Sequence, residues 1–226
     1  MKKIIKNPVL ILVLAAMLTM TGCPSNTPDE EKLPGRWTTA TTYWNSTSGT
    51  LIGAGPNYTY TSDYAEAEKK FKDDADAESG NFYTSPFYVT GPDDSFTGFQ
   101  ATASSTPKWS PYGFCFNVTQ NWEKFYLLII QDNTFKVRQY DGQYSDAIPW
   151  TKNDAINPAA DGNTVTVYTT DKNKTIVIQI NDVTVGVIRD PITTAGHCGV
   201  VGAITYDEYT SHVPNVSKFK FIKFQY

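Results

Sequence analysis

The sequence of 226 residues has few of the residues that metal sites, catalytic dyads and nucleic-acid surfaces need. Its two histidines, His197 and His212, form neither a His-x-His nor a His-x-x-x-His motif, so we expect no metal site. His197 is adjacent to Cys198, but neighbours on a strand point to opposite faces and cannot form a nucleophile–base pair. A basic excess is also absent, since 23 acidic against 19 basic residues give a net charge of −4. Nucleic acid is therefore excluded as a partner.

Long apolar runs are absent except at the amino terminus. Residues 8–20 read PVLILVLAAMLTM and are fewer than the roughly 20 residues that a transmembrane helix needs. They follow a basic head of Lys2, Lys3 and Lys6, an order that is typical of a signal peptide. We therefore predict that residues 1–22 are a signal peptide.

This segment ends in Met20-Thr21-Gly22-Cys23, which resembles the bacterial lipobox, although Met20 stands where leucine is usual. The resemblance implies a lipoprotein in which Cys23 becomes the amino terminus and carries acyl chains such as palmitate. Each buried methylene contributes about 0.8 kcal/mol, and more than one chain makes the anchorage durable. The expected location is the bacterial cell envelope, lipid-anchored at the outer membrane or cell surface. The alternatives are a secreted protein with a stray cysteine and a membrane-spanning anchor.

Loss of residues 1–22 leaves 16 basic and 23 acidic residues, a net charge of −7. Residues 23–33 are polar and contain proline without apolar periodicity, which indicates a tether. Residues 34–226 have a length that suits one all-β domain, and they contain no internal repeat.

The clearest strand pattern lies in residues 164–188, TVTVYTTDKNKTIVIQINDVTVGVI. Apolar and polar residues alternate in three stretches, which puts one face of each strand inward. Turn-forming residues separate the stretches at 171–174 and 181–182. The pattern predicts three antiparallel strands joined by tight turns.

Further strands are predicted along most of the chain. Residues 124–130, KFYLLII, are apolar on both faces, which predicts a central strand covered on each side. The apolar phase slips between Phe221 and Ile222, which predicts a bulge. Residues 46–56 and a long connection containing Ile148-Pro149-Trp150 are predicted to be loops. The predicted strands are 37–44, 82–89, 96–103, 112–118, 124–130, 134–140, 198–204 and 219–226.

One short helix is predicted near residues 62–77, with Ser62 or Asp63 as its N-cap and Gly80 as its stop. Its acidic end opposes the helix dipole, so either it stops near Lys72 or a cation compensates. The run Asp74-x-Asp76-x-Glu78 is partly similar to a calcium loop, but the glycine stands at position seven and Ser85 replaces the closing glutamate. We expect a solvated acidic loop and no cofactor; structural calcium is the alternative.

Cys115 and Cys198 both lie in predicted strands. An envelope protein meets oxidising conditions in many bacteria, so the two cysteines either form a structural disulfide or remain buried thiols. The sequence leaves both alternatives open.

The order of the segments YGFCF, FYLLIIQDNTFKVRQYDG, IPWTK, TIVIQINDVTVGVI, CGVVGA and FKFIKF resembles the concanavalin A-like lectin/glucanase jelly rolls. It is most similar to the laminin-G-like and glycosidase-like modules of bacterial envelope proteins. The resemblance covers residues 81–226 and implies an all-β, two-sheet antiparallel jelly-roll sandwich. It also implies one curved sheet whose concave face often receives glycans.

Hydrolases of these folds carry Glu-x-Asp-x-x-Glu on one strand, and no such string occurs here. We therefore expect binding rather than hydrolysis, with no catalytic residues. The remaining acidic candidates are isolated or loop-borne and are expected to be solvated: Glu123, Asp141, Asp146, Asp207 and Glu208.

The resemblance favours a carbohydrate-binding lipoprotein, because flat rings stack on sugar faces while polar groups hold hydroxyls. Trp150 follows Pro149 and could instead plug an edge of the sandwich. The second hypothesis is a structural or adhesive protein that binds a surface protein, and the third is a glycan-active hydrolase of unrecognised type. The candidate ligand-binding residues are Lys136, Arg138 and Tyr140 on one strand face, Tyr126 beside them, and Trp122 and Trp150 in flanking loops.

Overall fold

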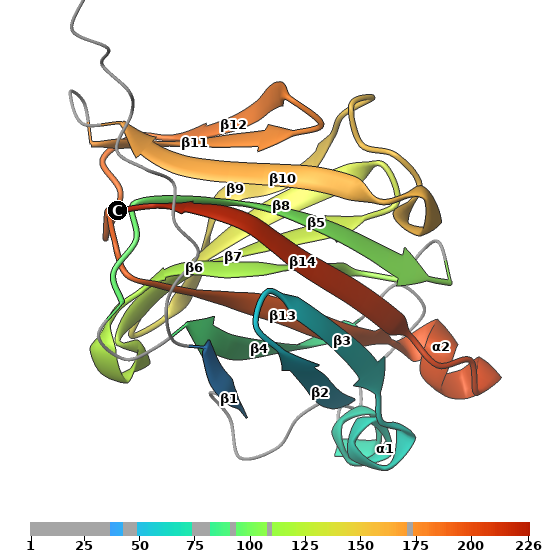
Figure 1. Cartoon of the computed structure of the whole chain (residues 1–226). Coiled ribbons are helices and arrows are strands. Elements are labelled where there is room, and N and C mark those ends of the chain that lie inside the picture. The colour runs from blue at the N-terminus through green and yellow to red at the C-terminus, as the bar shows by residue number, and fades with distance from the viewer. Residues whose placement is uncertain (1–36, 43–48, 74–81, 91–93, 108–109, 171–173) are drawn as a thin grey trace, which may run out of the picture. The chain divides into compact units, whose positions relative to one another are not determined.

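The computed structural model describes residues 37–42, 49–73, 82–90, 94–107, 110–170 and 174–226 (Figure 1). The predicted signal peptide, the tether and Cys23 lie outside these residues. Among the helices that the structure describes, none is both long and apolar enough to cross a membrane.

The described strands form two seven-stranded sheets in which every pairing is antiparallel. This confirms the predicted all-β, two-sheet jelly-roll sandwich.

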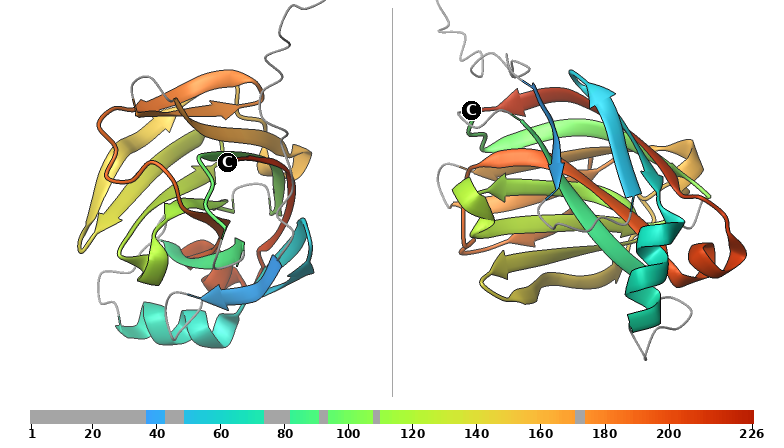
Figure 2. Two further views of the ribbon diagram at one scale, coloured as in Figure 1. Left: turned by 60° about the vertical axis from the view of Figure 1, so that its left-hand side comes forward. Right: turned by 90° about the horizontal axis from the view of Figure 1, so that it is seen from below.

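The two sheets are named here by their strands. Sheet A has the order β1 (Trp37–Thr42), β4 (Phe82–Thr90), β13 (His197–Thr205), β6 (Tyr112–Val118), β7 (Lys124–Gln131), β8 (Thr134–Asp141) and β9 (Tyr144–Lys152). Sheet B has the order β12 (Val183–Ile188), β11 (Thr175–Ile180), β10 (Asn163–Thr170), β5 (Gly98–Thr106), β14 (Val216–Gln225), β3 (Asn57–Ser62) and β2 (Gly49–Ala54). In Figure 2, sheet B arches over sheet A.

Aromatic rings from both sheets fill the space between them. Phe99 of β5 lies with its ring centroid 5.2 Å from Phe114 of β6 and 5.8 Å from Phe221 of β14. Such tilted and edge-on ring pairs contribute about 0.5–1.5 kcal/mol beyond the area that they bury. Strand β7 is buried on both faces, as its apolar sequence predicted.

Two local predictions in sheet B are confirmed. Asn181 and Asp182, between β11 and β12, have positive φ angles of 50° and 65°, the conformation of a tight hairpin turn. The register of β14 against β5 shifts between Phe221 and Lys223, where the bulge was expected. The extra residue keeps both Phe221 and Phe224 in the core.

Two predictions of loops were wrong. Strand β2 lies within residues 46–56, which were predicted to be a loop, and β3, which was not predicted, pairs with β2 and β14. The connection containing Pro149 is strand β9, at the edge of sheet A, where a missing N–H is tolerated. In each case partner strands compensate for a sequence in which aliphatic and polar residues do not alternate.

The predicted helix is α1 (Tyr64–Asp73). Asp63 is its N-cap, because its carboxylate accepts a hydrogen bond from the Ala65 N–H at 2.8 Å. The predicted stop at Gly80 and the acidic run 74–78 lie outside the described residues. A second helix, α2 (Tyr206–Ser211), was not predicted, and it packs on α1 through Phe71, Tyr206 and Tyr209.

Glu208 of α2 is only 1 % exposed, so the expectation of a solvated carboxylate was wrong for this residue. Its side chain accepts hydrogen bonds from the Ser110 hydroxyl and from the Thr205 N–H, the latter at 2.8 Å. Thr205 accepts in return from the Glu208 N–H, which completes a capping box. Burial raises the pKa of Glu208, while the hydrogen bonds from Ser110 and Thr205 oppose that rise.

Glu208→Gln tests this buried carboxyl. Because folding raises the pKa of Glu208 above its ordinary value of 4.5, its contribution to stability is fully present below that value. This contribution is lost as the pH rises through the pKa of Glu208 in the folded chain. Each unit of difference between the folded and unfolded pKa corresponds to about 1.4 kcal/mol in the free energy of unfolding. Urea unfolding at pH 5 and pH 7 should therefore show a larger loss for the wild type than for the variant. Parallel pH profiles would contradict the assignment.

Tyr60 of β3 is fully buried against Gly202 of β13, in the opposite sheet. A Cβ at Gly202 would lie 2.3 Å from two carbons of the Tyr60 ring. Gly202→Ala should therefore lower the free energy of unfolding by about 1–3 kcal/mol, as overpacking does.

The same substitution in a Tyr60→Leu background, measured by urea unfolding, is the control. It should cost less there, because the ring that it meets is gone. An equal cost in both backgrounds would show that the ring is not the cause.

Candidate functional site

The candidate site lies on the outer face of sheet A, along its last two strands. Phe135 and Val137 of β8 point into the core, so the alternate residues of that strand point outward. The register places Tyr140 opposite Tyr144 and Arg138 opposite Asp146. The β8–β9 face is defined here as Lys136, Arg138 and Tyr140 of β8 with Tyr144, Asp146 and Trp150 of β9.

Charged groups are held in pairs on the β8–β9 face. The Asp146 carboxylate lies 3.1 Å from Lys136 Nζ and 3.8 Å from Arg138 Nε. Arg138 Nε is buried and has no hydrogen-bond partner among the described residues. Exposed ion pairs contribute only about 0–1 kcal/mol, and 40 % of the Asp146 side chain is exposed. These ion pairs therefore add little to the stability of the fold.

Each cation also lies over an aromatic ring. The Arg138 guanidinium carbon is 4.4 Å from the Tyr144 ring centroid, and Lys136 Nζ is 5.7 Å from that of Trp150. Both distances fall within the range of cation–π attraction. The rings thus orient the two cations beside Asp146.

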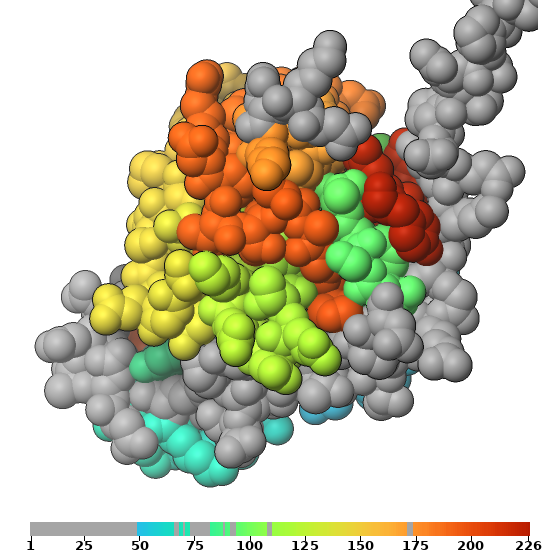
Figure 3. All heavy atoms as spheres, turned by 90° about the vertical axis from the view of Figure 1, so that its left-hand side faces the viewer, coloured from blue at the N-terminus to red at the C-terminus, as the bar shows by residue number. Residues whose placement is uncertain are grey.

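A second group of rings borders the face. Phe125 of β7 stacks on Tyr140 at 5.0 Å, and Tyr140 lies 5.0 Å from Tyr144. Trp122 of the 3₁₀ turn η2 (Gln120–Trp122) packs edge-on against Phe125 at 5.7 Å. In Figure 3 the lime η2 segment lies beside the yellow strands β8 and β9 at this end of the sandwich.

The structure brings together four of the six predicted ligand-binding residues. Lys136, Arg138, Tyr140 and Trp150 share the β8–β9 face, and half-buried Trp122 borders it. Trp150 is in a strand rather than a loop. It is 40 % exposed on the outer face, where Lys136 and Phe82 contact it, so it does not plug the space between the sheets.

The inclusion of Tyr126 was wrong. It is fully buried in the core, stacks on Phe116 at 5.2 Å and accepts a hydrogen bond from the Ile192 N–H at 2.7 Å. Strand β7 is apolar on both faces, so its sequence did not show which face meets the core. The register shows that Phe125, not Tyr126, lies opposite Tyr140.

Tyr144 and Asp146 were missed as site residues. They lie on β9, in the region predicted to be a connection. The sequence does contain a signal for a β-hairpin here. Gly142, whose φ is 77°, makes the turn after β8, and Tyr144 and Asp146 follow it two residues apart, as residues on one face of a strand do. The pattern of a hairpin would have placed both beside Arg138 and Tyr140.

The outer face of sheet A is concave. Phe82 of β4 and Trp150 of β9 lie five strand positions apart, roughly 24 Å along a sheet with its usual spacing. Their ring centroids nevertheless lie 6.0 Å apart, which requires the sheet to curl toward its outer side. The centre of this face is buried at Cys115, Leu127 and Ile129, so the β8–β9 margin is its accessible part.

Both cysteines that the structure describes are free, buried thiols. Cys115 lies with the residues of the outer face and Cys198 lies in the core, on opposite sides of sheet A. Burial raises the pKa of both thiols. The structure therefore favours the alternative of two buried thiols over a disulfide.

Acidic groups are sparse at the site. Asp146 is the one acidic side chain of the β8–β9 face, whereas glycoside hydrolysis commonly uses two carboxyl groups. Asp141 pairs with Lys124 at 3.3 Å, and Glu123 and Asp207 are exposed. Within the described part of the chain, no group of three or more His, Cys, Asp or Glu side chains could hold a metal ion. The β8–β9 face thus combines one carboxylate with two cations and three aromatic rings.

No protein-family model and no curated protein matches the sequence. Solved structures do match over most of the chain. The carbohydrate binding module CBM66 from Bacillus subtilis has 12 % identity and a TM-score of 0.51, over 84 % of this chain and 96 % of that one. The beta-glucanase of Bacillus licheniformis has 9 % identity and a TM-score of 0.52, over 84 % and 91 %. A lichenase from a mouse hindgut metagenome has 11 % identity and a TM-score of 0.53, over 84 % and 92 %.

At such low sequence identity, the similarity to these structures concerns the fold alone. The matched structures are jelly rolls of the lectin and glycosidase type, and their similarity in fold over 84 % of this chain confirms the resemblance found in the sequence. The chain has the concanavalin A-like jelly-roll fold.

Proposed function

We propose that this protein binds carbohydrate on the β8–β9 face. The observation that carries the proposal is the cluster of Lys136, Arg138 and Asp146 between the rings of Tyr144 and Trp150. Structural neighbours support it, because one is described as a carbohydrate binding module and others as glucanases.

The chemistry of the cluster suits a sugar ring. A pyranose has an apolar C–H face and a rim of hydroxyls, so it needs one flat ring and several directional polar groups. Trp150 offers an accessible ring, the partly exposed Asp146 carboxylate accepts hydrogen bonds from hydroxyls, and the Arg138 guanidinium, on a side chain that is 37 % exposed, donates them. Because Asp146 offsets one of the two positive charges and is itself an acceptor for hydroxyls, the ligand we propose is a neutral, hydroxyl-rich saccharide.

Two substitutions test this site. Trp150→Ala removes the stacking ring and should weaken binding roughly twofold to tenfold, the equivalent of about 0.5–1.5 kcal/mol. Asp146→Asn removes the charged acceptor and should weaken binding by a similar factor or more. A glycan array identifies the ligand, and calorimetric titration with it gives the dissociation constants.

Asp132→Asn, in the turn between β7 and β8, is the matched control, since it makes the same chemical change away from the face. It should bind as the wild type does. Absence of binding across a broad array, or equal affinities for Trp150→Ala, Asp146→Asn and the control, would refute the proposal.

We also propose that the protein is anchored in the bacterial envelope through acyl chains on Cys23. The support is the sequence alone: a basic head, a short apolar run and the lipobox-like Met20-Thr21-Gly22-Cys23. A tether of residues 23–33 would then give the domain reach from the membrane.

Cys23→Ser tests the anchor. Wild-type protein expressed in a bacterial host should enter the detergent phase of a phase partition, and its mass should exceed that of the cleaved polypeptide by its acyl chains. The variant should remain in the aqueous phase, because it has no sulfur to acylate. Recovery of the wild type in the aqueous phase without added mass would contradict the anchor.

A further inference from the structure

The outer face of sheet B carries positive charge in a protein whose net charge is negative. Along β14 the core takes Ser217, Phe219 and Phe221, so Lys218 and Lys220 point outward and are exposed. The bulge that follows leaves Lys223 on the same outer side. Neither Lys218 nor Lys220 is ion-paired within the part of the chain that the structure describes.

The strands around β14 present hydroxyls and amides, but no carboxylate. The register places Ser104 of β5 beside Lys218, Thr102 beside Lys220 and Gln100 beside Lys223. Acidic groups near this sheet, such as Asp161 and Asp182, belong to turns rather than to the outward positions of strands. The outward positions on the described strands β3, β5, β10 and β11 are Asn57, Thr59, Thr61, Gln100, Thr102, Ser104, Thr164, Thr166, Tyr168, Thr175, Val177 and Gln179.

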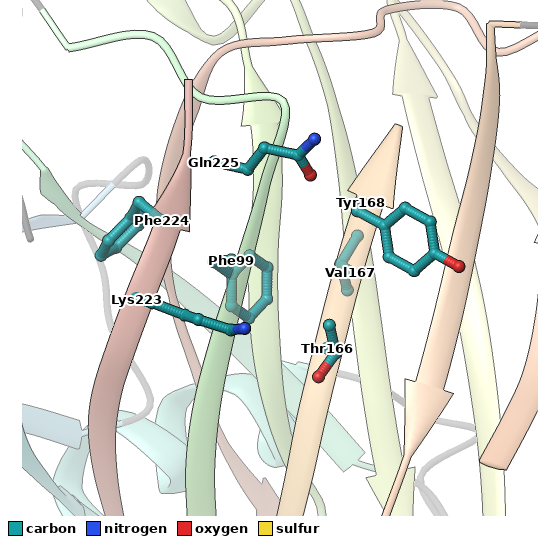
Figure 4. A pocket seen from close by; sticks show the side chains of 7 residues that line it. All are labelled: Phe99, Thr166, Val167, Tyr168, Lys223, Phe224 and Gln225. Carbon is teal, nitrogen blue, oxygen red and sulfur yellow. The ribbon is translucent and has the colours of Figure 1, made fainter. Parts of the chain in front are cut away.

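A hollow of about 160 Å³ lies on this face (Figure 4). It is lined by residues of β10 and β14, with Phe99 of the intervening strand β5 between them. Thr166 and Lys223 complete the polar lining. The hollow has the volume of roughly five waters at ~30 Å³ each, enough for one ring or substituent of a larger ligand.

We propose that the outer face of sheet B binds an acidic polysaccharide, a chain bearing carboxylates or sulfates. Lys218, Lys220 and Lys223 would meet its anionic groups, and the rows of threonine and glutamine would hydrogen-bond its hydroxyls. Alternate residues of a strand lie about 7 Å apart, so the lysines form a line that suits a repeating polyanion better than a single ion. This site is separate from the β8–β9 face, and it does not depend on the function proposed there.

The hollow favours a polysaccharide over the surface of an anionic membrane. It is a recess lined by directional groups, the Tyr168 ring, the Thr166 hydroxyl and the Gln225 amide, which one sugar unit can enter. Gln100 donates a hydrogen bond to Thr166 at 3.0 Å, which holds the neighbouring polar groups in place. A bilayer surface would engage the lysines without using the recess.

The test uses the full chain and three probes: polygalacturonate, a neutral galactan of similar length, and vesicles containing phosphatidylglycerol. The triple variant Lys218→Gln, Lys220→Gln and Lys223→Gln should bind polygalacturonate at least tenfold more weakly. Each lysine that meets an anionic group releases counterions, so the plot of the logarithm of the binding constant against the logarithm of the salt concentration should be less steep for the variant. The slope should differ by roughly 2 to 3. Tyr168→Ala should weaken polysaccharide binding without changing binding to vesicles.

The matched control is Lys69→Gln, Lys72→Gln and Lys124→Gln, which removes the same charge from α1 and β7. It should bind polygalacturonate as the wild type does. Lys220→Glu is a second variant in case the triple variant is destabilised, and circular dichroism checks the folding of each. Equal losses in the triple variant and its control would overturn the proposal. Binding to vesicles but not to polygalacturonate would also overturn it.

Discussion

The packing of aromatic rings between two antiparallel sheets is the interaction on which the other features of the structure depend. Phe99 and Phe221 from sheet B pack on Phe114 from sheet A, and Tyr60 from β3 packs on a glycine of the opposite sheet. Because side chains alternate along a strand, every ring that enters this core determines which of its neighbours faces outward. The same contacts therefore build the fold and arrange both outer faces.

The two outer faces differ in shape and chemistry. Sheet A curls until Phe82 and Trp150 meet across its outer side, and the ion-paired residues along β8 and β9 stay accessible at the margin. Sheet B instead presents lysines of β14 among hydroxyls, with a hollow lined by residues of β10 and β14. A sandwich of this kind has two separate outer surfaces, because the core between them separates one set of side chains from the other.

Sequence reasoning succeeded where a strand is apolar on one face or both. The hairpin turn at Asn181 and Asp182, the bulge after Phe221 and the doubly covered strand β7 were all predicted from local pattern. It failed for β2, β3 and β9, because none of these strands alternates aliphatic with polar residues and each depends on pairing with a partner strand. It also missed α2, although Thr205 and Glu208 have the spacing of a capping box.

By itself the sequence determined the fold class, most strands, and a strand face that carries Lys136, Arg138 and Tyr140, because alternation with period two is a local property. Only the tertiary structure decided that Tyr126 faces the core, that Asp146 lies between two cations, and that Glu208 is buried. It also decided that Cys115 and Cys198 lie on opposite sides of one sheet. The physical reason is that register and sheet curvature arise from contacts between segments far apart in the chain, which no local pattern records.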